Sequence, residues 1–306
     1  MALIEARSLG KSFGAHRAVE NLSFTVHPGS VTGFLGPNGS GKSTTMRLML
    51  GLDRGQGVTT FDGKTFAQLD HPMRHVGALL EAKPFHPTRK ARNHLRMLAA
   101  PNGIDDRRVD EVIEMVGLSG VARGKPGKFS LGMGQRLGIA AALLGDPHTL
   151  ILDEPSNGLD PQGISWLRNL LKYLASQGRS VFVSSHLLQE MGLLADELVV
   201  IGRGRMLANG PVADFVSHGG LATVAVTSPD LAVLGPALEA IGATLTPDDG
   251  TVVVRGATAE QIGDAAHTAG ARIHQLTTRQ ATLEEAFLEA TGLSEEFRGT
   301  QTGERQ

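Results

Sequence analysis

A glycine-rich stretch near residue 40, GPNGSGKST, constrains the fold of this chain more than any other feature of its sequence. In it, four residues separate Gly36 from Gly41, and Lys42 and Ser43 follow directly. The run SVTGFL before it is typical of a buried strand, and STTMRLMLGL after it favours a helix that Gly51 ends. A loop of this kind can direct several backbone N–H groups at phosphate oxygens, with the positive end of the helix dipole behind them. The sequence therefore predicts an α/β fold with a nucleoside triphosphate site at this loop.

The residue types of the loop predict how the site binds its ligand. Lys42 is expected to reach the β and γ phosphates, and Ser43 to offer its hydroxyl to Mg²⁺. A flexible Gly/Ser turn is the alternative, but such a turn does not need a Lys–Ser pair at the start of a helix. The residues expected around the nucleotide are Gly36, Pro37, Asn38, Gly39, Ser40, Gly41, Lys42, Ser43 and Thr44.

Two later strand-like runs end in residues that suit the chemistry of phosphate transfer. HTLILDEP ends in Asp153, which is expected to meet Mg²⁺, and Glu154, which is expected to accept a proton from the attacking water. SVFVSS ends at His186, which is expected to contact the γ-phosphate and the water. Strands often end in acids, and a lone histidine is more often packed or solvated. The ordered combination with the glycine-rich loop favours the functional interpretation of all three residues.

A second glycine-containing stretch, SLGMGQR, runs from Ser130 to Arg136 and precedes the helix-like run QRLGIAAALLG. Ser130 could cap this helix. Gly132 and Gly134 could also let the backbone approach an anion, with the positive end of the helix behind it. The two interpretations are compatible with each other.

Composition excludes several classes of protein. Hydrophobic residues make up 41% of the 306 residues, enough for a substantial core. The formal net charge of -2 leaves no basic footprint, so we expect no nucleic-acid partner. The absence of cysteine excludes disulfides and thiolate sites and suits a reducing compartment. The start of the chain does not read as a signal peptide, and the apolar runs are too short to cross a bilayer.

With these motifs in order, residues 1–215 resemble the ABC (ATP-binding cassette) transporter ATPases. The Walker A loop is GPNGSGKST, the Walker B strand is LILDE, the D-loop is SNGLD through Asp160, and the switch histidine is His186. SLGMGQR falls where that family has its signature sequence, and with SNGLDPQG it is most similar to the bacterial drug- and antibiotic-export ATPases. The resemblance implies a RecA-like core with an antiparallel β subdomain and a helical subdomain at about residues 84–145.

The resemblance also implies an assembly. In the family two copies pair head to tail, and each ATP is held by the Walker A loop of one copy and the signature loop of the other. Asp160 is then expected at this composite site. The signature residues expected to contact the ATP of the second copy are Ser130, Leu131, Gly132, Met133, Gly134 and Gln135.

Three positions depart from the usual family pattern. The commonest signature reads Leu-Ser-Gly-Gly-Gln, so the serine that contacts the γ-phosphate is replaced here by Gly132 unless Ser130 substitutes. The Q-loop glutamine is replaced by Glu81, whose carboxylate is expected near Mg²⁺ or its water. The residue expected to stack on adenine is Phe13, which could alternatively be ordinary core packing.

The character of the sequence changes after about residue 217. The hairpin and helix in ELVVIGRGRMLANGPVADF close the expected ATPase domain, residues 1–217. Residues 221–292 then read strand, helix, strand, strand, helix, strand, which matches the ferredoxin-like split βαβ motif of a small α+β domain, with a final helix in LEEAFLEATG. The last residues, 293–306, are polar and are expected to be disordered.

Together these expectations predict one function for the chain. We expect the ATP- and Mg²⁺-binding, ATP-hydrolysing subunit of an exporter, working as a homodimer with a separate integral-membrane permease at the cytoplasmic face of the plasma membrane. The alternative is a soluble ATPase of the same family that acts on ribosomes or DNA, although the chain lacks the fused second cassette, coiled-coil insert or basic extension common there. A P-loop switch protein or kinase is less consistent with the signature stretch, and no Asn-Lys-x-Asp guanine motif is present.

Overall fold

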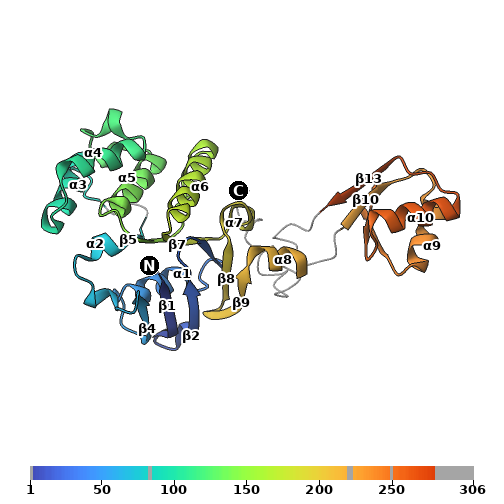
Figure 1. Cartoon of the computed structure of the whole chain (residues 1–306), viewed down its shortest axis with the longest axis horizontal. Helices are drawn as coiled ribbons and strands as arrows, with labels where there is room; N and C mark the ends of the chain where they lie inside the picture. Colours follow the sequence, from blue (N-terminus) through green and yellow to red (C-terminus); the bar gives the residue numbers. More distant parts are fainter. Residues whose placement is uncertain (1–2, 82–84, 219–222, 249–250, 280–306) are drawn as a thin grey trace. The chain divides into compact units, whose positions relative to one another are not determined.

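The computed structural model of the chain describes residues 3–81, 85–218, 223–248 and 251–279 (Figure 1). The chain divides into two compact units, residues 1–210 and 211–306, and each is described by itself. The helix α8 (Val212–His218) belongs to the second unit, whereas the sequence analysis assigned it to the end of the ATPase domain.

A six-stranded sheet forms the centre of the first unit. The strands lie in the order β5 (Val76–Leu79), β6 (Thr149–Leu152), β7 (Ser180–Ser185), β3 (Val31–Leu35), β8 (Glu197–Gly202) and β9 (Arg205–Pro211). The pairs β5–β6, β6–β7, β3–β7 and β3–β8 are parallel. All five residues of β3 and all six of β7 are buried, as expected of parallel strands covered on both faces. The carboxyl ends of β3, β6 and β7 therefore lie at one edge of the sheet, where ligands of such sheets bind.

An antiparallel sheet packs against this central sheet through aromatic side chains. Its strands lie in the order β2 (His16–Val26), β1 (Ile4–Phe13) and β4 (Gln56–Phe61). The Phe24 ring lies 5.2 Å from that of Phe182, and the Phe34 ring lies 5.0 Å from Phe182, measured between centroids. The predicted antiparallel β subdomain is therefore confirmed, and one apolar core joins it to the phosphate-loop strand.

The helices of the first unit include a group that follows β5 in the chain. Figure 1 shows α3, α4 and α5 gathered together, in green. Val109, Val112 and Val116 lie at helical spacing and are fully buried. Arg92 of α3 forms an ion pair with Asp110 of α4, so this arginine links the two helices. The bounds are α1 (Lys42–Met49), α2 (Pro72–His75), α3 (Ala91–Ala99), α4 (Asp106–Met115), α5 (Leu131–Leu143), α6 (Pro161–Ser176) and α7 (Leu188–Leu194), with 3₁₀ turns at Phe66–Gln68, Ala100–Asn102, Ser119–Val121 and Pro126–Lys128.

Among its described residues, the second unit contains a four-stranded antiparallel sheet and two helices after α8. The elements are β10 (Thr223–Thr227), α9 (Leu231–Ala240), β11 (Thr244–Asp248), β12 (Thr251–Arg255), α10 (Ala259–Ala269) and β13 (Gln275–Arg279), and the strand order is β11-β12-β10-β13. This order, with every neighbouring pair antiparallel, confirms the predicted split βαβ arrangement. The predicted helix in LEEAFLEATG and the predicted disordered tail, 293–306, lie outside the described residues.

Within the part of the chain that the structure describes, no helix is both long enough and apolar enough to span a lipid bilayer.

Candidate nucleotide site and catalytic centre

Two positions in the loop between β3 and α1 have room only for glycine. Gly41 has φ of 107°, and a Cβ atom built there would lie 2.3 Å from the carbonyl oxygen of Ala18. A Cβ atom on Gly36 would lie 2.5 Å from the carbonyl oxygen of Ile201. The lack of room for a Cβ atom explains why both positions of the motif carry glycine. The loop leads directly into the first turn of α1. Its N–H groups lack partners within the helix and can bind an anion.

Lys42 is anchored beneath this loop by its own backbone. The side chain is 7% exposed, and its Nζ donates a hydrogen bond of 2.7 Å to the carbonyl oxygen of Gly36. Nζ also lies 3.5 Å from Oε1 of Glu154, which forms an ion pair with it. The cation predicted for the phosphates is therefore already paired with the acid predicted to be the general base.

Asp153 and Glu154 follow β6 and are held by β7. Ser184 of β7 donates a hydrogen bond of 2.5 Å to Oδ1 of Asp153, and its oxygen accepts the N–H of Glu154 at 2.8 Å. The φ of Glu154 is 47°, in the left-handed region that residues other than glycine seldom adopt. This turn directs the side chain of Glu154 toward Lys42, while the acid one residue before it contacts Ser184.

His186, which follows β7, completes a row of three groups with Glu154, which follows β6, and Lys42, which begins α1. Its Nδ1 lies 2.9 Å from Oε2 of Glu154. A carboxylate accepts hydrogen bonds, so Nδ1 carries the proton in this contact and Nε2 remains for another partner. Lys42, Glu154 and His186 thus lie in contact at the carboxyl edge of the sheet, although the chain separates them widely.

A pocket of about 330 Å³ lies over the loop. Its lining includes Glu154, Lys42 and most of the loop, together with Phe13, His16 and Ala18 from the β1–β2 hairpin. Phe13 is 54% exposed, which rules out the alternative that it is core packing. His16 and Ala18 are lining residues that the sequence analysis missed. The signal that could have found them is their position just after Phe13 across a tight turn.

Glu81 lies apart from this pocket. It follows β5, is exposed, and is not among the residues that line the pocket. The pKa of Arg47 on α1 is raised, chiefly by its hydrogen bond to Asp53 and to a smaller extent by the charge of Glu81. The structure therefore places Glu81 outside the lining of the pocket, and its contact with Mg²⁺ or its water stays a prediction.

The signature stretch forms the first turn of α5. The Oγ of Ser130 accepts the N–H of Met133 at 3.2 Å, so the helix-cap interpretation is confirmed. Gly132 approaches Gly158 closely, because a Cβ atom on it would lie 2.8 Å from the Gly158 carbonyl oxygen. Leu131 is 47% exposed, which leaves this turn accessible to another molecule.

Gln135 is a buried member of this stretch, and its contact with a second nucleotide stays a prediction. It is 1% exposed, and its Nε2 donates a hydrogen bond of 3.2 Å to the carbonyl oxygen of Glu154 in the same chain. Its side chain therefore contacts the backbone of Glu154 within the same chain. The physical reason is its place on the buried face of α5, which packs on the sheet.

Asp160 caps a helix in its own chain. Its Oδ1 accepts the N–H of Gly163 at 2.8 Å at the start of α6. This bond accounts for an acid at the position just before Pro161. Contact of Asp160 with a second nucleotide stays a prediction.

Comparison with known proteins agrees with this geometry. Residues 19–157 match the family described as ABC transporter, and residues 222–284 match a family described as Domain of unknown function (DUF8746). Over 214 residues the chain is 42% identical to the bacitracin transport ATP-binding protein BcrA of Bacillus licheniformis, covering 68% of this chain and 70% of that protein. Over 299 residues it is 32% identical to the Nod factor export ATP-binding protein I of Burkholderia lata, covering 95% of this chain and 98% of that protein.

Solved structures give the same result. The chain is similar to a solved ATP-binding subunit of an ABC transporter, with a TM-score of 0.64 and 27% identity over 70% of this chain and 92% of that one. Its fold also matches a dimeric post-hydrolysis ATP-binding cassette bound to ADP and Pi, with a TM-score of 0.61 and 22% identity over 68% of this chain and 98% of that one. With the phosphate loop, the paired acids and the histidine in one row, the chain belongs to the ATP-binding proteins of ABC transporters.

Proposed function

We propose that this chain binds ATP with Mg²⁺ and hydrolyses it as the motor subunit of an exporter. The single observation that carries the proposal is the row of Lys42, Glu154 and His186 beneath the phosphate loop. It combines a phosphate-binding cation, a general base and a group that can orient water within contact distance. ATP and Mg²⁺ supply the phosphoanhydride bond and the charge that neutralises its oxygens, and the protein supplies position and electrostatics.

The residues present fit such a ligand. Gly39 lies at the tip of the loop with φ of 79° and open space around its Cα, so a phosphate can approach the backbone closely. The Oγ of Ser40 is buried without a hydrogen-bond partner in the described structure. Ser43 is exposed on the first turn of α1. We propose that Ser43 and Asp153 hold Mg²⁺ and that Glu81 contributes only if its loop moves.

Each residue of the row then has a role in hydrolysis. Lys42 exchanges its contact with Glu154 for phosphate oxygens, which frees the carboxylate. Glu154 accepts a proton from water at the oxygen that faced Lys42. His186 keeps the other oxygen fixed through Nδ1 and offers Nε2 toward the terminal phosphate.

The first turn of α5, where Leu131 is exposed, supports an assembly of two copies. The positive end of α5 lies there and has its own cap, so it can bind an anion that belongs to another molecule. We propose that Leu131, Gly132, Met133 and Gly134 meet the ATP of a second copy, with Asp160 nearby. Phe13 then stacks on the adenine of the first.

The relatives named for bacitracin transport and Nod factor export support export as the task. We propose an integral-membrane permease as the partner, at the cytoplasmic face of the membrane. The ATPase domain would extend over about residues 1–217 and the accessory domain over 221–292.

Crosslinking tests the assembly of the composite site. Cysteines at Asn38 and Met133 are the only ones in such a variant, because the chain has no native cysteine. A direct disulfide needs Cα atoms within about 7 Å, so a short bifunctional thiol reagent is the better probe. ATP with Mg²⁺ should give a dimer band, and ADP should give little. An internal crosslink at monomer mass, or equal yield without nucleotide, would contradict head-to-tail pairing.

Copurification tests the cellular role. The tagged full chain should retain an integral-membrane protein through purification in mild detergent. Recovery with ribosomes or DNA instead would contradict the exporter function and leave the nucleotide chemistry intact.

A further inference from the structure

Ser184 places one hydroxyl between the two acids of the catalytic centre. It lies at the end of β7 and is fully buried. Its Oγ donates a hydrogen bond to Oδ1 of Asp153 at 2.5 Å and accepts the N–H of Glu154 at 2.8 Å. A hydroxyl has one donor and two acceptor lone pairs, so it can serve both neighbours at once. Alanine or valine at this position could serve neither.

Strand register explains how Ser184 reaches both acids. Parallel pairing sets Leu152 of β6 opposite Val183 of β7, so Asp153 and Ser184 are the next residues on the two strands. The hydroxyl therefore meets the acids where β6 ends. The pairing of the two strands fixes this contact, which cannot be predicted from the local sequence pattern of either strand.

The backbone at Glu154 needs this support. Its φ of 47° costs free energy for a residue with a side chain, and surrounding hydrogen bonds must hold it. Ser184 holds the N–H of Glu154, and Gln135 holds its carbonyl oxygen at 3.2 Å. The peptide is thus held on both sides, which fixes the direction of the Glu154 carboxylate toward Lys42 and His186.

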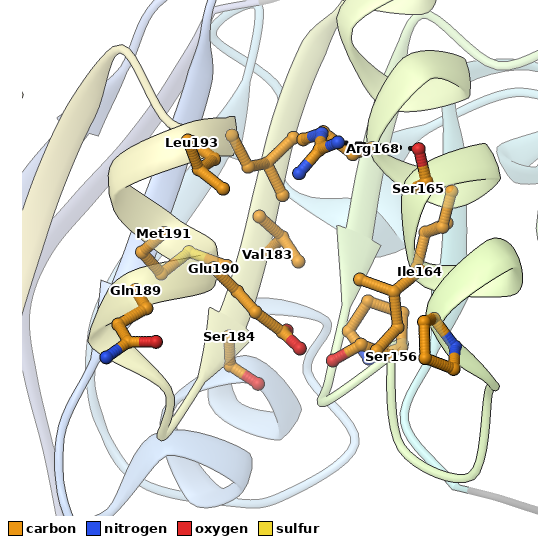
Figure 2. Close-up of a pocket in the computed structure, with 14 residues that line it drawn as sticks. Ser156, Ile164, Ser165, Arg168, Val183, Ser184, Gln189, Glu190, Met191 and Leu193 are labelled. Atoms are coloured by element: carbon orange, nitrogen blue, oxygen red, sulfur yellow. Dashed lines mark hydrogen bonds between the residues drawn. The ribbon is translucent and has the colours of Figure 1, made fainter.

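We infer that Ser184 is a positioning residue for hydrolysis, which aims Asp153 at Mg²⁺ and Glu154 at the attacking water. The inference rests on the proposed function. Ser184 does not touch the nucleotide pocket, since it is absent from the lining of that pocket. It lines instead the separate pocket of about 290 Å³ between α6 and α7, where Figure 2 shows it near Ser156 and Glu190.

This role predicts that removing the hydroxyl of Ser184 lowers turnover without weakening ATP binding. Ser184→Ala removes the donor to Asp153 and leaves the N–H of Glu154 without a partner. Losing a hydrogen bond to a charged group corresponds to a fall in kcat of about 10- to 100-fold. The affinity for ATP without Mg²⁺ should stay within about threefold of wild type, because Lys42 and the loop are untouched.

A thermal-shift measurement gives a readout that does not depend on turnover. ATP in EDTA should raise the Tm of Ser184→Ala as it does that of the wild type. The additional rise on adding Mg²⁺ should be largely lost in the variant, because Asp153 is no longer fixed. A purely structural role would lower the Tm of the nucleotide-free protein and leave the Mg²⁺ increment unchanged.

Two further variants make the comparison specific. Ser184→Thr keeps the hydroxyl, suits a strand, and has the adjacent pocket as room for its methyl group, so it should restore the Mg²⁺ increment and most of the turnover. Thr32→Val is the matched control, because Thr32 is a fully buried residue of the neighbouring strand β3 whose hydroxyl has no partner in the described structure. It should behave as the wild type in both assays.

The outcomes separate this inference from the proposed function. Wild-type turnover together with an unchanged Mg²⁺ increment in Ser184→Ala would overturn the positioning role alone. Equal losses in Ser184→Ala and Ser184→Thr would also overturn it, because the hydroxyl would not matter. Absence of ATP hydrolysis by the wild-type chain under every Mg²⁺ concentration would overturn the proposed function and the inference with it.

Discussion

Replacing Glu154 with glutamine should separate nucleotide binding from hydrolysis. The carboxylate contacts Lys42 on one side at 3.5 Å and His186 on the other at 2.9 Å. Glutamine keeps the shape of the side chain but cannot accept a proton from water at neutral pH. Loss of a general base lowers the rate by about 10²- to 10⁴-fold, so turnover should fall by this factor.

The same change should strengthen ATP binding. Two unit charges 3.5 Å apart attract by about 5 kcal/mol at an effective dielectric constant of about 20. The ligand must exchange this attraction for contacts between Lys42 and phosphate, and partial solvation of the pair reduces the net effect to about 1–2 kcal/mol. Without the carboxylate, ATP affinity should therefore rise about tenfold. The Tm of the nucleotide-free variant should fall, because Lys42 loses its ion-pair partner.

Three measurements test this reasoning together. Steady-state phosphate release gives turnover, titration with a fluorescent ATP analogue gives affinity, and differential scanning fluorimetry gives the Tm. Glu190→Gln, which removes an acid of α7 outside the nucleotide pocket, is the matched control and should leave all three near wild type. Wild-type turnover in Glu154→Gln would refute the general-base role, and weaker binding would refute the competition between Glu154 and phosphate for Lys42.

Three other changes have distinct expected outcomes. His186→Ala should bind ATP normally and release phosphate at least about tenfold more slowly, and unchanged turnover would contradict its role. Gly41→Ala should lose ATP binding in an equilibrium titration, because φ is 107° and the new Cβ would lie 2.3 Å from a carbonyl oxygen, whereas Gly51→Ala, at a positive φ with open space, should keep it. Hydrogen bonds from the side chain of Arg272, and then from its backbone N–H, hold the pKa of Asp230 well below its usual 3.8. A lowered pKa stabilises the fold above pH 3.8 and less as the pH falls below it, so the protection of α9 against hydrogen exchange, taken relative to the intrinsic rate at each pH, should be lower at about pH 3 than at about pH 5. Asp230→Asn should be less protected at both pH values and lose this difference, which mass spectrometry of the intact chain can measure.

Local sequence patterns were sufficient to predict most of the architecture. Strand, glycine-rich loop and helix are successive segments around residue 40, and their periodicity and turn residues are visible in a short window. The same holds for the β8–β9 hairpin, whose two connecting residues, Arg203 and Gly204, both have positive φ. It also holds for the strand and helix order of the C-terminal sheet. These features depend on neighbours in the chain, so the sequence alone determines them.

Residue type and motif order also predicted which side chains meet at the site. Lys42, Glu154 and His186 each end or follow a buried strand, and parallel strands bring such ends to one edge. The exposure of Phe13 could not be predicted, because an aromatic side chain at a strand end suits a core and a pocket equally well. Only the packing of the β1–β2 hairpin on the loop decided between them.

The tertiary structure alone decided the contacts that hold the acids. Asp153 and Ser184 are 31 residues apart, and Gln135 and Glu154 are 19 apart. The register between strands and the packing of α5 on the sheet bring these pairs together. Neither produces a periodic pattern in the sequence. The motif position of Gln135 is visible in the sequence, whereas the face of α5 that becomes buried depends on the sheet beneath it. A hydrogen bond between distant segments forms only where packing has already set the distance, which is why these contacts could not be read from the chain.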